Sequence, residues 1–116
     1  MKLLFHVLKC SKKLNIDNET LSNGKIGDKL IEETEEVICQ LGNLRLNNDY
    51  TSLVETIKET FDVIQVCILI LWRCNKLAKR KYDKYNLLQE INLEHKDKLI
   101  YRGWEPVTGI EVDVKE

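Results

Sequence analysis

The stretch KLIEETEEVICQL, residues 29–41, decides the fold. Its apolar residues recur every three or four positions, and this spacing predicts one amphipathic helix. The same stretch places four glutamates directly beside the face that must be buried. The predicted buried stripe consists of Leu30, Thr34, Val37, Leu41 and Leu44, and the acids are Glu32, Glu33, Glu35 and Glu36. Acids along the edge of a buried stripe are the feature that has to be explained.

The bulk composition indicates one globular domain covering residues 1–116. The chain is 43% hydrophobic and 32% charged with a single proline, which favours an all-α fold over disorder. A net charge of −1 gives no global attraction to nucleic acid. The cysteines form no C-x-x-C pair, and Cys39, Cys67 and Cys74 stand in apolar, helix-like runs. We expect reduced, mostly buried thiols in a cytoplasmic protein.

Two apolar segments bear on targeting and membrane insertion. The N-terminal MKLLFHVLKC is short, is interrupted by His6 and Lys9, and is followed by no small-residue cleavage site, so we expect no signal peptide. The longest apolar run, VIQVCILILW at residues 63–72, reaches about half of a membrane span. It predicts a buried helix and no membrane partner.

The first half of the chain reads as two helical segments separated by a loop. Residues 2–13 are expected to form a short helix. Residues 14–27 are rich in asparagine and glycine, which is typical of a loop. The next helix is expected to begin near Gly27 or Asp28, with Asp28 as its cap or first-turn acid. Asn-Asn-Asp at residues 47–49 should end it.

A long helix is expected over residues 53–79. Beyond Asp62 it becomes apolar on all sides, and helices of that kind are buried all round. One short chain has few other helices to cover it, so a partner subunit is expected to complete the bundle. The basic run at residues 76–85 is interpreted as a solvated helix end. The predicted buried stripe consists of Leu53, Ile57, Phe61, Ile64, Ile68 and Leu71.

A last helix is expected over residues 85–101 and should end at Gly103. Its apolar stripe includes His95, which we interpret as a buried core histidine. Residues 105–116 form a tail in which Ile110, Val112 and Val114 alternate with polar residues, as in an extended segment. The remaining stripe residues are Leu88, Ile91 and Leu99.

Two acid pairs carry the most specific functional signal. Glu33 and Glu36 are three residues apart, and so are Glu59 and Asp62, so each pair lies on one side of its helix. If the two helices pack antiparallel across residues 47–49, the pairs meet at similar depth. Two unit charges about 6 Å apart interact by about 3 kcal/mol at an effective dielectric of 20. A hard divalent cation such as Mg²⁺ would compensate this repulsion.

The acids also admit other interpretations. A glutamate-rich helix is commonly a solvated face, which is how we interpret Glu35 and, in the simplest case, Glu32. A di-iron bundle requires E-x-x-H on its helices, and neither His6 nor His95 follows a glutamate at that spacing. Zinc catalysis requires His or Cys clusters, which the chain lacks.

The combined pattern resembles the MazG-like nucleotide pyrophosphohydrolases, of the all-α NTP pyrophosphatase group. KLIEETEEV is similar to that family's K-L-x-E-E-x-x-E-V segment, and E-x-x-E is followed after 22 residues by E-x-x-D. EHKDKLIYRGW resembles the basic segment of small, phage-type members, which reads close to H-N-x-K-L-x-x-R-G-W. The chain departs from it at Lys96, where the family has asparagine. The likeness covers about residues 26–104, and the matching residues near the C-terminus are His95, Lys98, Arg102, Gly103 and Trp104.

The resemblance implies Mg²⁺-dependent hydrolysis of nucleoside or deoxynucleoside triphosphates to monophosphate and pyrophosphate, with Mn²⁺ as an alternative ion. It further implies that one of the acids, or Glu32, orients or deprotonates the attacking water. Lys98 and Arg102 would bind phosphates. Lys29 is either a second phosphate ligand or the i, i+4 partner of Glu33. The implied metal ligands are Glu33, Glu36, Glu59 and Asp62.

Three points stay open at the level of sequence. Trp104 either stacks on a base or packs the helix end. The protein is expected to be a homodimer or a dimer of dimers, and the alternative to an enzyme is an inactive helical homo-oligomeric interaction module. A nucleic-acid binder using residues 76–84 is disfavoured by the near-zero net charge and the lack of an aromatic platform.

Overall fold

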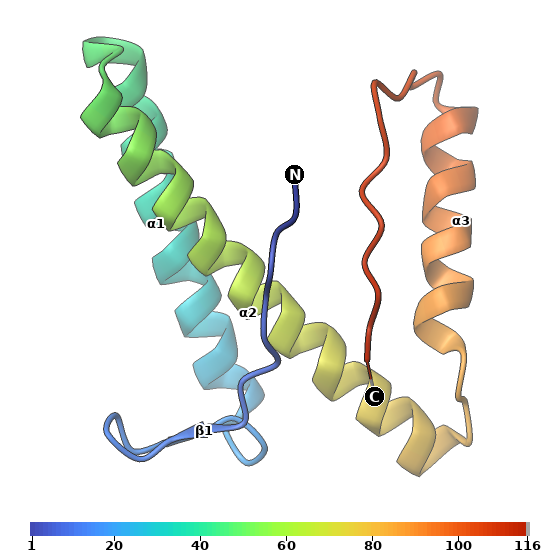
Figure 1. Ribbon diagram of the computed structural model, residues 1–116. Coiled ribbons are helices and arrows are strands. Elements are labelled where there is room, and N and C mark those ends of the chain that lie inside the picture. The colour runs from blue at the N-terminus through green and yellow to red at the C-terminus, as the bar shows by residue number, and fades with distance from the viewer. Residues whose placement is uncertain (116) are drawn as a thin grey trace.

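The computed structural model describes residues 1–115 and is an all-α fold built on a helical hairpin (Figure 1). The two long helices pack side by side and antiparallel, which confirms the predicted fold class. The third helix packs only against the end of the second and diverges from the hairpin. The elements are β1 (Cys10–Ser11), β2 (Ile16–Asp17), α1 (Asn23–Asn47), α2 (Tyr50–Tyr82) and α3 (Leu87–Tyr101). No helix in residues 1–115 is long and apolar enough to cross a membrane.

The helix boundaries follow from side-chain caps. The backbone N–H of Lys25 donates to Ser22 Oγ at 3.2 Å, so α1 begins at Asn23 rather than near Gly27, and the predicted start was wrong. Residues 47–49 do separate the helices, as predicted. Asn48 ends α1 in the left-handed conformation, and Asp49 caps α2.

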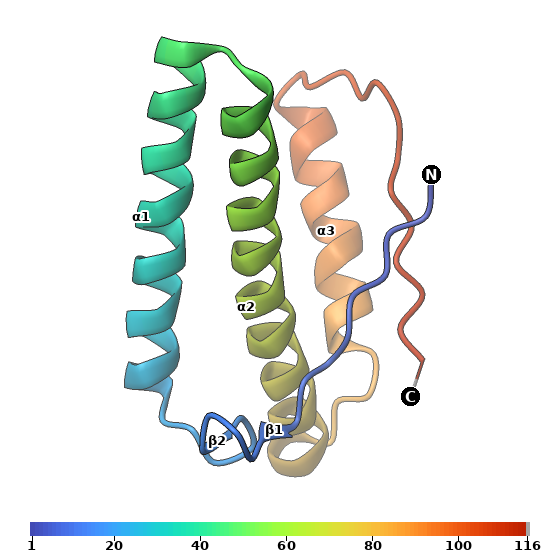
Figure 2. The ribbon, with the colours of Figure 1, turned by 60° about the vertical axis from the view of Figure 1, so that its left-hand side comes forward.

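The predicted helix at residues 2–13 is wrong. Residues 1–9 form an extended arm, and β1 pairs antiparallel with β2. The arm runs beside α2 (Figure 2), where Gln65 Nε2 donates to the carbonyl of His6 at 2.7 Å. Phe5 meets Phe61 edge to face, with ring centroids 5.5 Å apart. A helix this short is marginal alone, and α2 supplies the contacts that hold the segment extended.

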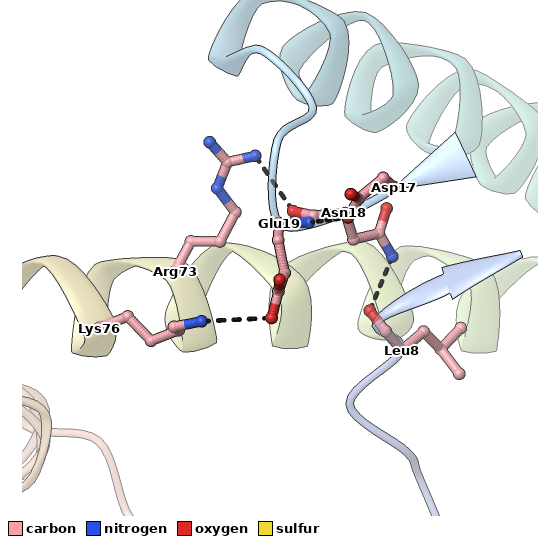
Figure 3. A network of polar contacts seen from close by, with 6 residues as sticks. All are labelled: Leu8, Asp17, Asn18, Glu19, Arg73 and Lys76. Atoms are coloured by element: carbon pink, nitrogen blue, oxygen red, sulfur yellow. Dashed lines mark hydrogen bonds and ion pairs between the residues drawn. The ribbon is translucent and has the colours of Figure 1, made fainter. Parts of the chain in front are cut away.

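A polar network fixes the loop before α1 to α2 (Figure 3). Asn18 Nδ2 donates to the carbonyl of Leu8 at 2.8 Å, which joins the arm to the loop. Arg73 Nη1 donates to the carbonyl of Asn18 at 3.4 Å. Lys76 Nζ lies 3.5 Å from Glu19 Oε1. The entry to α1 is therefore held from α2 by two cations.

The core of the single chain is thin and differs from the predicted stripes. The buried hydrophobic residues are Ile26, Val66 and Ala78, at 3–8% exposure. The predicted α2 stripe lies to the side and back of the helix, because the line of α2 that meets α1 runs through Ser52, Thr56 and Val66. Predicted buried residues that are exposed are Thr34, Leu41, Leu53, Ile57, Phe61, Leu71, Ile91, His95, Cys39, Cys67 and Cys74.

The C-terminal part of the chain follows the predicted order of elements. Gly103 has φ +84°, and its N–H donates to the carbonyl of Ile100 while that of Trp104 donates to Leu99. This pattern is a Schellman motif, so Gly103 ends α3 as predicted. Residues 104–115 then run back without regular secondary structure, opposite in direction to α3 (Figures 1 and 2). Residue 116 lies outside the described residues.

The chain is more open than a compact protein of its size. Its accessible surface is 10385 Å² at 13.6 kDa, whereas a compact monomer of that mass exposes about 6,600 Å². Its radius of gyration is 16.8 Å, against about 13 Å for a compact domain of this length. Large apolar side chains are exposed on all three helices.

Candidate metal centre

The helical hairpin brings three predicted acids together. Glu33 comes from α1, and Glu59 and Asp62 come from α2. One carboxylate oxygen from each lies within 4.8 Å of the other two. In residues 1–115 this is the only group of three or more His, Cys, Asp or Glu side chains with ligand atoms so close. Because the helices are antiparallel, two i, i+3 pairs far apart in sequence meet at one depth, as the sequence predicted.

Glu33 is the most deeply placed of the acids. It is 6% exposed, and its Oε2 is buried without a hydrogen-bond partner. Its other oxygen, Oε1, lies 2.8 Å from Lys29 Nζ. A buried carboxylate oxygen without a donor costs free energy unless a proton or a cation satisfies it. The second oxygen of Glu33 therefore offers a ligand position to a cation.

Glu36 completes the acidic cluster, which we define as Glu33, Glu36, Glu59 and Asp62. Its carboxyl is exposed, yet its pKa is raised from 4.5 to about 7. The main cause is hydrogen bonding of its protonated form to Glu59, followed by hydrogen bonding to Glu33. Such a bond requires one shared proton between two carboxylates. The raised pKa therefore reflects how closely the carboxyl groups of the cluster approach one another.

Asp62 responds to the same crowding. Burial raises its pKa, and the charges of Glu33 and Glu59 raise it further, whereas Lys29 opposes them. The pKa of Lys29 is raised in turn, chiefly by its hydrogen bond with Glu33. The cluster therefore carries more negative charge than its one neighbouring cation neutralises.

Three further charged residues, Lys29, Glu32 and Glu55, stand within one turn of the cluster in the sequence. Glu32 Oε2 is 3.7 Å from Lys29 Nζ and its side chain is exposed, so it stands at the rim. Glu55, one turn before Glu59, pairs with Lys58 at 3.0 Å instead of joining the acids. Of the two interpretations of Lys29, the structure shows the i, i+4 ion pair.

The basic residues of the C-terminal segment are not placed beside the acids within one chain. Lys98 lies in the last turn of α3, and Arg102 is the first residue after that helix. Trp104 lies two residues beyond Arg102 and is 68% exposed. In the described residues α3 packs against α2 but not against α1, and the two helices diverge (Figure 1). The phosphate and base roles of these residues stay predictions.

The shared proton predicts a pH dependence for the metal-free protein. The folded state holds a proton on Glu36 up to about pH 7, whereas an unfolded glutamate releases it near its ordinary pKa. Stability from this group is therefore present at about pH 4.5 and is lost as pH rises toward 7. We expect the melting temperature without divalent ions to fall over that window.

Glu36→Gln should flatten this slope, because glutamine binds no proton. Differential scanning calorimetry in chelator at low salt, from pH 5 to 7.5, measures it. Glu35→Gln, on the same helix, is the matched control and should keep the slope. Equal slopes of melting temperature against pH for both variants would contradict the proton assigned to Glu36.

No protein family model, curated protein or solved structure matches the chain. The family likeness therefore stays a resemblance carried by the motifs in the sequence. The geometry of the acids stands independently of it.

Proposed function

We propose that the protein hydrolyses nucleoside or deoxynucleoside triphosphates to monophosphate and pyrophosphate in a Mg²⁺-dependent reaction. The observation that carries the proposal is the cluster of Glu33, Glu59 and Asp62 with oxygens within 4.8 Å, together with the unpartnered Oε2 of Glu33. The motif resemblance supports the reaction type. The proposal includes Mn²⁺ as an alternative ion and a place in the cytoplasm.

The donor set fits a hard divalent cation. All the converging groups are carboxylates, and oxygen is the ligand that Mg²⁺ prefers. Glu33 Oε2 offers a buried oxygen, and Asp62 is exposed, so the cluster is open to solvent on one side. Mg²⁺ bound there supplies neutralisation of phosphate charge and activation of water.

The residues of the chain would then have separate roles in metal binding, water activation and phosphate binding. Glu33, Glu36, Glu59 and Asp62 would hold the ion, and Glu32 is proposed to orient or deprotonate the attacking water. Lys29 keeps one oxygen of Glu33 engaged, and the other oxygen would be a ligand of the ion. Lys98 and Arg102 are proposed phosphate ligands in the assembled protein.

We also propose that the chain acts as a homodimer or dimer of dimers. Its surface exceeds that of a compact monomer by about 3,800 Å², whereas a standard interface covers only about 800 Å² per partner. An inactive helical interaction module would have the same excess of accessible surface, and it is the second candidate function. That module would self-associate in the same way but would bind no metal ion tightly.

Pyrophosphate release separates these candidates. We expect the purified protein to release pyrophosphate from members of a nucleoside and deoxynucleoside triphosphate panel with Mg²⁺, and not with chelator. Analysis of the products by anion exchange should show the monophosphate and no diphosphate. An oligomer that releases nothing from the panel and binds no Mg²⁺ in calorimetry would establish the interaction module instead.

A further inference from the structure

The α1–α2 hairpin has two unlike faces, and we infer that the apolar one is the surface on which a second copy of this chain packs. We define the apolar face as Ile31, Ile38, Leu41, Leu53, Ile57 and Leu71, whose exposures run from 45 to 63%. The inference rests on the proposed self-association and is independent of the proposed hydrolysis. It assigns the face that is covered and the face that stays open.

The positions on α1 show the division. A helix turns about 100° per residue, so the buried Ile26 and Glu33 mark the line that faces α2. Glu36 lies to one side of this line. Ile31 and Ile38 lie to the other side and are 59% and 63% exposed.

The positions on α2 show the same division. Ser52 and Val66 are buried and mark the line that faces α1. Asp62 lies to one side of it, whereas Leu53 and Leu71 lie to the other. Phe61 and Gln65, which hold the N-terminal arm, lie on the outer side of α2, whereas Leu53 and Leu71 are 45% and 54% exposed.

The two apolar sides belong to one surface. Carboxylates of both helices meet in the acidic cluster, so the acidic sides of α1 and α2 share one face of the antiparallel hairpin. The opposite sides must then share the other face. The hairpin is therefore acidic on one face and apolar on the opposite one.

A second copy fits this face better than a charged partner does. The intervening positions of α2 on this side are Ile64, Cys67 and Ile68, and none is charged. On α1 the charged residue on this side is Arg45, seven residues after Ile38 and in the last turn of the helix. The same face of another copy can therefore lie against it with this charge at the end of the contact, as an isologous two-fold interface allows. The surface in excess of a compact monomer is larger than a standard interface needs. Back-to-back packing of this kind leaves both acidic clusters accessible.

Two neighbouring substitutions on α1 test the face. Ile38→Lys places a cation on the apolar face, whereas Cys39→Lys places the same cation on the outer side of the same turn. We expect Ile38→Lys to weaken self-association by at least about 100-fold, because a two-fold interface loses the residue twice. Cys39→Lys should associate like the wild type. Sedimentation equilibrium measures both, with circular dichroism to confirm helicity.

Cysteine alkylation of the wild type covers the case in which Ile38→Lys does not fold. Cys67 lies on the side of the apolar face and Cys39 does not, and both are exposed in the single chain. At high micromolar concentration we expect Cys67 to react at least about tenfold more slowly than Cys39, with the difference shrinking on dilution by mass action. Peptide mass mapping after iodoacetamide treatment reports each site.

Three results would overturn the inference. A monomeric wild type would remove self-association itself. An Ile38→Lys protein that associates like Cys39→Lys would show that copies meet elsewhere. Protection of Cys67 that does not change on dilution would show that α3 of the same chain covers the face. Nucleotide turnover enters none of these measurements, so the hydrolase proposal stands or fails separately.

Discussion

Asp62→Asn is expected to leave the protein folded and to abolish nearly all nucleotide turnover. Asp62 is exposed and lies at the open side of the acidic cluster, so the amide fits the same space. The amide loses the charge that would hold Mg²⁺ against the phosphates. Lewis-acid stabilisation is worth several kcal/mol, so we expect kcat/KM to fall by at least about 1,000-fold.

The same substitution should stabilise the metal-free protein. Asp62 has a raised pKa because it is partly desolvated and faces Glu33 and Glu59. Its charge therefore works against folding at neutral pH, and the neutral amide relieves that repulsion. We expect the melting temperature in chelator to rise, and the gain that wild type obtains from added Mg²⁺ to shrink.

Steady-state kinetics, Mg²⁺ calorimetry and melting curves on one set of proteins check both effects. Asp28→Asn is the matched control, because Asp28 is exposed on α1 and outside the cluster. It should keep wild-type kinetics and metal affinity. Wild-type turnover by Asp62→Asn would end the metal assignment, and loss of turnover in both variants would point to an effect unrelated to the cluster.

The acidic cluster could be predicted from the sequence because it depends only on helix periodicity and on antiparallel packing across a short break. Two i, i+3 pairs and a short break at residues 47–49 fix both the side and the depth of the acids. The helix caps were harder to predict, because Asn23-Gly24 has the composition of a loop although Ser22 caps a helix there. Whether a residue caps a helix depends on the backbone N–H groups of the first turn that lack a partner within the helix. Amino-acid composition does not show which N–H groups these are.

The buried stripes were the larger error, and its cause is physical. Apolar spacing shows which side of a helix must be covered but not by what. On α2 the apolar side that includes Leu53 and Leu71 lies beside the line that meets α1, and the hairpin closes through Ser52, Thr56 and Val66 instead. The sequence thus predicted surfaces that must be buried, and the single chain leaves them exposed. What covers these apolar surfaces is a property of the assembled protein and not of the single chain.

Arg102→Ala tests the other half of the proposed reaction, namely recognition of the triphosphate. Arg102 immediately follows α3, in a backbone conformation that alanine can adopt. The substitution leaves all four acids in place, so Mg²⁺ affinity should not change. A charge-assisted hydrogen bond contributes about 1.5–3 kcal/mol, so we expect KM for the triphosphate to rise by about 10- to 150-fold. kcat should fall only if the contact tightens in the transition state.

The result also reports on how α3 is placed in the working protein. In one chain α3 diverges from the hairpin and does not pack against α1. An effect on KM therefore requires α3 to close onto the acids or to reach them from another copy. Lys84→Ala, in the turn before α3, is the control for simple loss of positive charge and should leave KM unchanged. If Arg102→Ala keeps both the KM and the kcat of the wild type, the phosphate role assigned to the C-terminal basic segment is wrong, even where the acids are needed for turnover.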